Sequence, residues 1–442
     1  MSMISQGGSQ PVVAGAPNIS GSGDQNNHFA FAAMTSLFFI WGFITALNDI
    51  LIPQLKAAFS LNYTQAMLVQ FCFFGAYFLV SPLAGKLIER IGYIKGIMVG
   101  LATIALGCLL FYPAAEISVY ALFLFGLFIL ASGVTVLQVS ANPYVAILGK
   151  EQTAASRLSL AQAINSLGHT LAPLFGAALI FSATADLSAS AEVAGNTADA
   201  KSVQLPYLIL AGVTLLTAAG FYFLKLPLLT PPVAAASPTQ QLLTAESSIW
   251  QQKGLLLGVL AIFLYVGAEV SIGSFLVNYL ALPHIGGLAE KQASTMVAYY
   301  WGGAMIGRFI GALLTRYISA SYVLLTNALI AILLLFITMN STGMVAVWSV
   351  IAIGFFNSIM FPTIFTMAIR GLGPLTSRGS GLLCQAIVGG AILPLLQGLV
   401  ADSIGVQLSF IVPVLAYAYI ATYASYSTRQ QRHISSLSQV TL

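Results

Sequence analysis

The sequence predicts an all-α membrane protein with twelve transmembrane helices. Only 6% of its 442 residues are charged and 58% are hydrophobic, whereas a soluble domain carries about 25% charged residues. Apolar segments of about 18 or more residues recur along almost the whole chain, and each is long enough to cross the hydrocarbon core as a helix. Strands of a membrane β-barrel would instead alternate apolar and polar residues.

Twelve apolar segments follow one another, separated by short polar stretches. Several of them exceed the roughly 20 residues that a span needs, which indicates tilt or extension beyond the bilayer. The predicted spans are 29–55, 64–84, 93–112, 117–147, 157–183, 205–224, 254–281, 292–314, 320–338, 344–369, 379–400 and 406–426.

The basic residues predict the orientation. With twelve spans and both termini in the cytoplasm, only Lys56, Lys201 and Lys291 of the 16 Lys and Arg residues fall outside, and all the others, Arg308 included, are assigned to the inner side. Such an excess is the positive-inside pattern. Because the basic residues are assigned to short loops, the net charge of +4 does not indicate a nucleic-acid partner.

Composition divides the chain into two halves joined by a linker. Residues 1–28 are rich in Gly, Ser, Asn and Gln and are expected to form a disordered cytoplasmic tail. Residues 225–253 are rich in Pro, Ser and Gln and predict a cytoplasmic linker between a six-helix bundle at 29–224 and another at 254–426. Residues 427–442 form a second cytoplasmic tail.

The two halves repeat a sequence pattern. Gly-x-Leu-x-x-Arg at 85–90 recurs at 311–316, and the spacing of Arg157, Gly168 and Pro173 recurs in Arg378, Gly389 and Pro394. A parallel repeat of this kind places a substrate path between the halves, near the middle of the membrane.

Several stretches resemble the major facilitator superfamily and, within it, the fucose–galactose–glucose:cation symporter family. GKLIERIGYIKG (85–96) is similar to the superfamily's signature loop. The narrower resemblance is carried by WGFITALNDILIP (41–53), QVSANPYVAILG (138–149), SRLSLAQAINSLG (156–168), YVGAEVSIGSFLVNYL (265–280), YWGGAMIGRFIG (300–311) and FNSIMFPTIF (356–365). The resemblance implies sugar uptake coupled to a cation. It also implies a functional acid at Asp49, and a difference from the L-fucose permease, which has glutamate where this chain has Gln138.

The Leu-Asn-Asp stretch at 47–49 supplies the candidate cation site. Gly42, Thr45, Ala46 and Asp49 share one face of an ideal helix, and this small, polar face is suited to lining a cavity. Asp49 is predicted to hold Na⁺ or accept a proton; the alternative is a structural aspartate that caps a broken helix before Pro53. Asn48 projects elsewhere and either assists the cation site or bonds a neighbouring helix.

Amide side chains of the first half are the candidate sugar ligands. Gln138 and Asn142 lie one turn apart in span four, and Gln162, Asn165 and His169 share a face of span five. Amides both donate and accept hydrogen bonds, which suits hydroxyl groups that point in several directions. The alternative is hydrogen bonding between helices, and a neutral, hydrogen-bonded His169 is favoured over a proton carrier.

Polar residues of the second half complete the predicted site. Glu269 is an acid deep in span seven, with Tyr265 one turn before it, and is either a sugar ligand or a second coupling site. Asn278 faces away from Glu269 unless SIGS at 271–274 breaks the helix. The remaining candidates are Trp301 as a stacking platform for a sugar, Asn357 and Gln385.

The predicted function is a secondary symporter that imports a glucose-, galactose- or fucose-type monosaccharide with a cation by alternating access, with Na⁺ favoured over H⁺. Glu89 and Arg90 are the expected gate at the inner ends of the halves, and anchoring by positive loops is the alternative reading. A monomer in the bacterial inner membrane is expected, with no enzyme activity and no cofactor. The main rival is an exporter of drugs or metabolites on the same fold; a membrane transferase and a sensor are less favoured.

Overall fold

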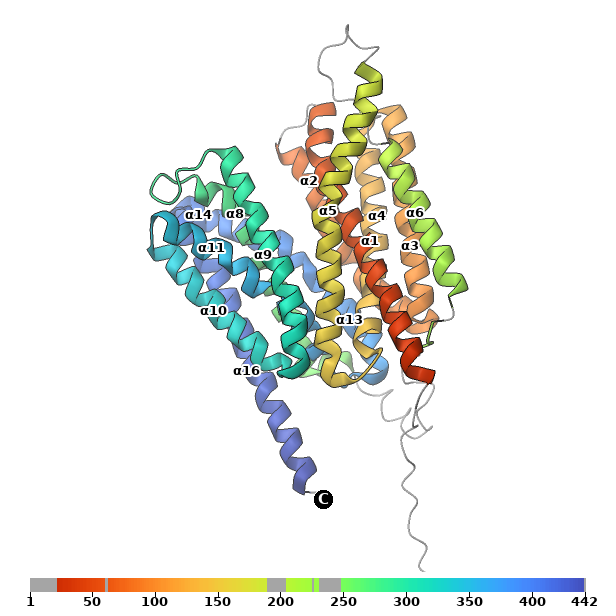
Figure 1. Cartoon of the computed structure of the whole chain (residues 1–442), viewed down its shortest axis with the longest axis vertical. Coiled ribbons are helices and arrows are strands. Elements are labelled where there is room, and N and C mark those ends of the chain that lie inside the picture. Colours follow the sequence, from red (N-terminus) through yellow and green to blue (C-terminus); the bar gives the residue numbers. More distant parts are fainter. Residues whose placement is uncertain (1–21, 60–62, 189–203, 225, 230–247, 441–442) are drawn as a thin grey trace, which may run out of the picture.

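The computed structural model describes residues 22–59, 63–188, 204–224, 226–229 and 248–440. Within this part of the chain the structure is helical, and the helices form two bundles that lie side by side (Figure 1). The predicted linker at 225–253 lies largely outside the described residues, and so does most of the tail at 1–28. The predicted fold class, an all-helical membrane protein of two six-span halves, is confirmed.

The first bundle contains six long helices and a short 3₁₀ turn. Their bounds are α1 (Ser22–Ala58), α2 (Tyr63–Ile91), α3 (Tyr93–Ile117), α4 (Tyr120–Ile147), η1 (Glu151–Thr153), α5 (Ala154–Ser188) and α6 (Gln204–Phe223). α1 begins at Ser22, so residues 22–28, which were expected to be disordered, are helical. α1 also continues past Pro53, so the alternative of an aspartate that caps a broken helix before this proline is wrong.

The second bundle contains six spans, three of which are interrupted. Their bounds are η4 (Ile249–Gln251), α8 (Lys253–Leu280), α9 (Glu290–Tyr317), α10 (Ala320–Asn340), α11 (Gly343–Asn357), α12 (Met360–Ile369), η5 (Gly373–Leu375), α13 (Thr376–Gln385), η6 (Ala386–Val388), α14 (Gly389–Ile404), α15 (Val406–Ser409) and α16 (Ile411–Val440). Among the described residues, 10 spans are long and apolar enough to cross a membrane; α5 and α9 do not meet this criterion.

A proline explains the break in span ten. Pro362 has no N–H group, so it cannot bond the carbonyl of Ser358, four residues earlier, and the helix is interrupted between α11 and α12. Span seven behaves differently, because α8 runs without interruption from Lys253 to Leu280. The proposed helix break at SIGS, residues 271–274, is therefore wrong.

Equivalent glycines bring the first and fifth helix of each half into close contact. A Cβ atom on Gly168 of α5 would lie 2.3 Å from the carbonyl oxygen of Phe39 in α1. A Cβ atom on Gly389 of α14 would lie 2.0 Å from the carbonyl oxygen of Phe263 in α8. The glycines of the sequence repeat thus have the same role in both halves, because each allows a close approach of a neighbouring backbone that any side chain would prevent.

The halves meet at the end of the molecule that carries the short α2–α3 and α9–α10 connections. There α2 packs against α13 and α5 against α9, and the bundles diverge toward the opposite end (Figure 1). Gly85 and Gly381 make the first contact possible, because a Cβ atom on either would lie within 3 Å of a backbone oxygen on the other half.

Candidate functional site

A pocket lies between the two bundles. It has a volume of about 150 Å³. The first half contributes Trp41, Gln138 and Gln162, and the second half contributes Tyr265, Val266, Glu269, Arg308, Phe361, Pro362 and Ile387. Four of the predicted ligands, Gln138, Gln162, Tyr265 and Glu269, are therefore brought together from helices α4, α5 and α8. Because both halves line the pocket, a molecule bound there contacts both of them and can favour a change in their relative position.

Two buried polar groups line this pocket, the Gln138 amide and the Tyr265 hydroxyl. Gln138 donates through Nε2 to the Tyr77 hydroxyl at 2.7 Å, which fixes the amide and leaves its Oε1 without a hydrogen bond among the described residues. The Tyr265 hydroxyl is also buried, and it faces the Glu269 carboxylate. Because a buried polar atom without a partner is costly, the free Oε1 atom of Gln138 points to a ligand with hydroxyl groups.

Trp41 adds an aromatic wall. Its side chain is 6% exposed, lies 5.2 Å from the Phe38 ring between centroids, and lines the pocket from α1. Trp41 is not among the predicted ligands, although its position in the sequence indicates such a role. Trp41 lies one helical turn before Thr45, next to the polar face that also carries Asp49.

Glu269 is paired with Arg308 inside the bundle. The Glu269 Oε1 atom lies 3.4 Å from a terminal nitrogen of Arg308, and the two side chains are only 12% and 16% exposed. Arg308 lies in α9, nine residues before its last residue Tyr317, so its assignment to the basic inner loops is wrong. Its charge balances that of a carboxylate which would otherwise be isolated in a poorly solvated interior.

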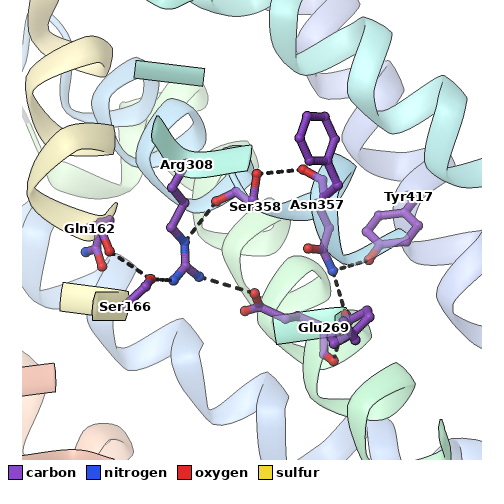
Figure 2. A network of polar contacts seen from close by, with 9 residues as sticks. Gln162, Ser166, Glu269, Arg308, Asn357, Ser358 and Tyr417 are labelled. Carbon is purple, nitrogen blue, oxygen red and sulfur yellow. Dashed lines mark hydrogen bonds and ion pairs between the residues drawn. The ribbon is translucent and has the colours of Figure 1, made fainter. Parts of the chain in front are cut away.

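The arginine reaches two further groups, as Figure 2 shows. Its second terminal nitrogen donates to the hydroxyl of Ser166 in α5, and its Nε donates to the Ser358 carbonyl at 3.3 Å. Gly307 allows this approach, since a Cβ atom there would lie 2.4 Å from both Phe355 O and Ser358 Oγ. Arg308 therefore contacts both halves of the molecule.

The polar face of α5 divides between the pocket and α1. Gln162 lines the pocket. Asn165 instead donates to the Phe38 carbonyl at 2.9 Å, and the Nδ1 atom of His169 lies 3.3 Å from the Thr45 hydroxyl. Both residues thus contact α1, as the alternative of hydrogen bonding between helices describes.

Other predicted ligands are not among the residues that line the pocket. Asn142 is fully buried, with no hydrogen bond to either polar side-chain atom from any described residue. Asn357 donates to the Tyr300 hydroxyl at 2.7 Å. It also donates to the Tyr417 hydroxyl at 3.3 Å (Figure 2). Gln385 donates across the interface to the Phe78 carbonyl at 3.1 Å.

The last two predicted ligands of the second half, Trp301 and Asn278, lie at more exposed positions. Trp301 is 40% exposed and packs over Gly273, and Asn278 is exposed. The side chains of Asn48 and Asp49, in α1, lie outside the described part of the structure.

Ion pairs join the halves at their closed end. Arg378 of α13 donates through Nε to Glu89 of α2 at 2.7 Å, and Arg370 lies 2.7 Å from Glu151 of η1. Arg90, the second residue of the predicted gate, is exposed. The sequence does not indicate that Arg378 is the partner of Glu89, because the two residues are 289 positions apart and belong to different halves.

Comparison with known proteins places the chain in a family. The Major Facilitator Superfamily model matches residues 29–383. A "Glucose/galactose transporter" of Brucella abortus biovar 1 (strain 9-941) is 58% identical over 402 residues, which cover 91% of this chain and 95% of that protein. The "L-fucose-proton symporter" of Escherichia coli (strain K12) is 36% identical over 413 residues, covering 90% of this chain and 93% of the relative.

A solved structure agrees with this placement. The crystal structure of the transporter FucP in the outward conformation superposes with a TM-score of 0.81 at 35% identity, covering 91% of this chain and 99% of that one. The two halves, the pocket between them and the sequence similarity lead to one conclusion: the chain belongs to the Major Facilitator Superfamily, in the family that contains the glucose/galactose transporters and the L-fucose–proton symporters.

Proposed function

We propose that this protein imports a hexose-type monosaccharide together with a cation, by alternating access across a bacterial inner membrane. The observation that supports this most is the pocket between the halves, where Gln138 Oε1 is buried without a hydrogen bond from any described residue. The names of the relatives, glucose/galactose transporter and L-fucose-proton symporter, support the same class of solute.

The lining residues suit a sugar. Gln138 and Gln162 offer amide groups from the first half, and Tyr265 and Glu269 offer a hydroxyl and a carboxylate from the second. Trp41 offers a flat apolar surface against which the C–H face of a pyranose ring can stack. We assign these five side chains as the primary sugar contacts. Asn142, Asn357, Gln385, Asn278 and Trp301 remain candidates for a second layer or for another state of the cycle.

Cation coupling is assigned to Asp49, with Asn48 beside it on α1. We favour Na⁺ over H⁺ because Gln138 stands where the L-fucose permease has an acid, and a glutamine cannot carry a proton. The pairing of Glu269 with Arg308 supports its role as a sugar ligand rather than a second coupling site. A carboxylate that is already balanced by a guanidinium does not need a cation to remain in the interior.

The arrangement of the halves fits an outward-facing state. If the basic, closed end faces the cytoplasm and both termini lie there, the pocket communicates with the outside, and the ion pairs of Glu89 and Glu151 hold the inner side shut. One positive charge moving down about 100 mV releases about 2.3 kcal/mol. At 1.4 kcal/mol for each factor of ten, this supports roughly 40-fold accumulation of a neutral sugar.

Uptake by the purified protein in proteoliposomes tests the proposal. Labelled D-glucose, D-galactose and L-fucose are offered under an inward Na⁺ gradient at equal pH, and under an inward H⁺ gradient without Na⁺. We expect uphill accumulation of at least one hexose in the first condition. Accumulation under the H⁺ gradient alone would overturn the choice of Na⁺, and the absence of any sugar flux, with efflux of unrelated solutes instead, would favour the exporter.

A further inference from the structure

Arg308 uses its three nitrogens in three different directions. One terminal nitrogen lies 3.4 Å from the Glu269 carboxylate in α8, the other donates to Ser166 in α5, and Nε donates to the carbonyl of Ser358 at the break between α11 and α12 (Figure 2). Only a planar guanidinium presents donors in such a fixed fork, so a lysine could not make the same set of contacts.

Each of these contacts meets a need that the local structure creates. Ser358 has a free carbonyl because Pro362 cannot donate to it. Glu269 needs a positive partner in a poorly solvated interior. Pro362 and its neighbour Phe361 also form one wall of the pocket, so a single side chain supports both the acidic ligand and this wall.

The third contact crosses between the halves. Ser166 belongs to α5 of the first half, and α5 packs against α9 where the bundles are close. Its hydroxyl also donates to the carbonyl of Gln162, which lines the pocket. A movement that separates α5 from α9 must break the contact between Ser166 and Arg308, whereas the contacts to Glu269 and Ser358 lie within one half and can persist.

We propose that Arg308 is the positioning residue of the transport cycle. It holds the Glu269 carboxylate and the Phe361–Pro362 wall in their sugar-binding arrangement, and its bond to Ser166 ties this arrangement to the state in which α5 and α9 are joined. The inference rests on the proposed function, since it assigns a role in binding the sugar. It makes the affinity for external sugar depend on a residue outside the set of primary sugar contacts.

Two substitutions test this role. One keeps the positive charge at position 308 but changes the arrangement of its hydrogen-bond donors, and the other removes the hydroxyl of Ser166. In proteoliposomes, Arg308→Lys is expected to raise the KM for labelled D-glucose about tenfold, the loss expected for a misdirected charge-assisted hydrogen bond. The unfolding temperature of the purified protein should stay close to that of the parent. Ser166→Ala, which removes the contact between the halves together with the hydroxyl's bond to the Gln162 carbonyl, is expected to raise the KM about threefold.

Ser132→Ala is the matched control. Ser132 is 8% exposed and its hydroxyl bonds the carbonyl four residues earlier, as that of Ser166 does, but it has no arginine partner among the described residues. If Arg308→Lys kept the parent's KM, or if Ser166→Ala changed it no more than Ser132→Ala, the inference would be wrong. If Arg308→Lys does not fold, the comparison of the two serine variants decides. If the parent itself takes up no hexose, the proposed function fails first.

Discussion

Arg378 and Glu89 are separated by most of the sequence, yet Nε of Arg378 donates to the Glu89 carboxylate at 2.7 Å and joins the two halves at their closed end. Glu89 lies in the last turns of α2 and Arg378 near the start of α13, where glycines let the two helices come close. The side chain of Glu89 is 26% exposed and that of Arg378 is 47% exposed. A partly exposed ion pair of this kind is suited to breaking and re-forming.

Removing the charge of Glu89 should favour the opening of this end. Exposed ion pairs contribute about 0.2–1 kcal/mol, so Glu89→Gln should lower the maximal rate of sugar uptake by no more than about fivefold. Exchange of the charges, Glu89→Arg with Arg378→Glu, should restore part of the loss. Arg90→Gln, at an exposed neighbouring position, is the control; an equal loss of rate there would show that removing any charge at this end, and not breaking the pair, is responsible.

Gln138 should contribute to sugar affinity through its free Oε1. Gln138→Leu keeps the size of the side chain but removes the acceptor, and we expect the KM for D-glucose to rise about tenfold. Tyr77→Phe removes the partner of Nε2 without touching Oε1, so its effect should be smaller. The KM values come from initial rates of labelled glucose uptake, and a larger effect of Tyr77→Phe would speak against direct binding by Gln138.

Trp41 should act through its flat ring. Trp41→Phe keeps an aromatic surface and should raise the KM less than Trp41→Leu, for which we expect an increase of about three- to tenfold. Trp348 is 49% exposed, in α11, and Trp348→Leu should leave sugar affinity unchanged. Competition of labelled glucose uptake by unlabelled glucose measures the affinities; equal values for both Trp41 variants would exclude stacking.

The repeated glycines should control stability rather than sugar recognition. Gly168→Ala and Gly389→Ala place a Cβ atom 2.3 Å and 2.0 Å from a backbone oxygen, and such overpacking typically costs about 1–3 kcal/mol. Gly212 of α6 has no atom within 4 Å of the added Cβ, so Gly212→Ala should be neutral or slightly stabilising. Thermal unfolding of the purified variants gives the comparison, and an unaltered unfolding temperature for both repeat variants would contradict the close packing.

Much of the fold follows from the sequence because the membrane restricts the choices. Apolar segments of sufficient length must form helices in lipid, and the predicted start of the tenth span at 344 agrees with α11, which starts at Gly343. The break within that span was not predicted. It follows from Pro362 together with an arginine from another helix that stabilises the freed carbonyl, and such a partner cannot be found from local sequence.

Within the site, residue type predicted the individual candidates better than their arrangement. Gln138, Gln162 and Glu269 were found because polar residues in an apolar segment usually have a role. Arg308 was assigned to a loop because counting basic residues near the ends of spans does not distinguish a loop arginine from one two or three turns inside a helix. Its partner Glu269 lies in a different helix, so only the tertiary structure reveals the pair.

In the proposed transport cycle, Asp49 couples the movement of the halves to a cation. The most direct measurement compares Asp49→Asn with the parent in proteoliposomes under an inward Na⁺ gradient, together with exchange of labelled D-glucose in the absence of any gradient. We predict that the variant exchanges glucose but no longer concentrates it. Accumulation by Asp49→Asn to the level reached by the parent would show that the Asp49 carboxylate is not needed for coupling.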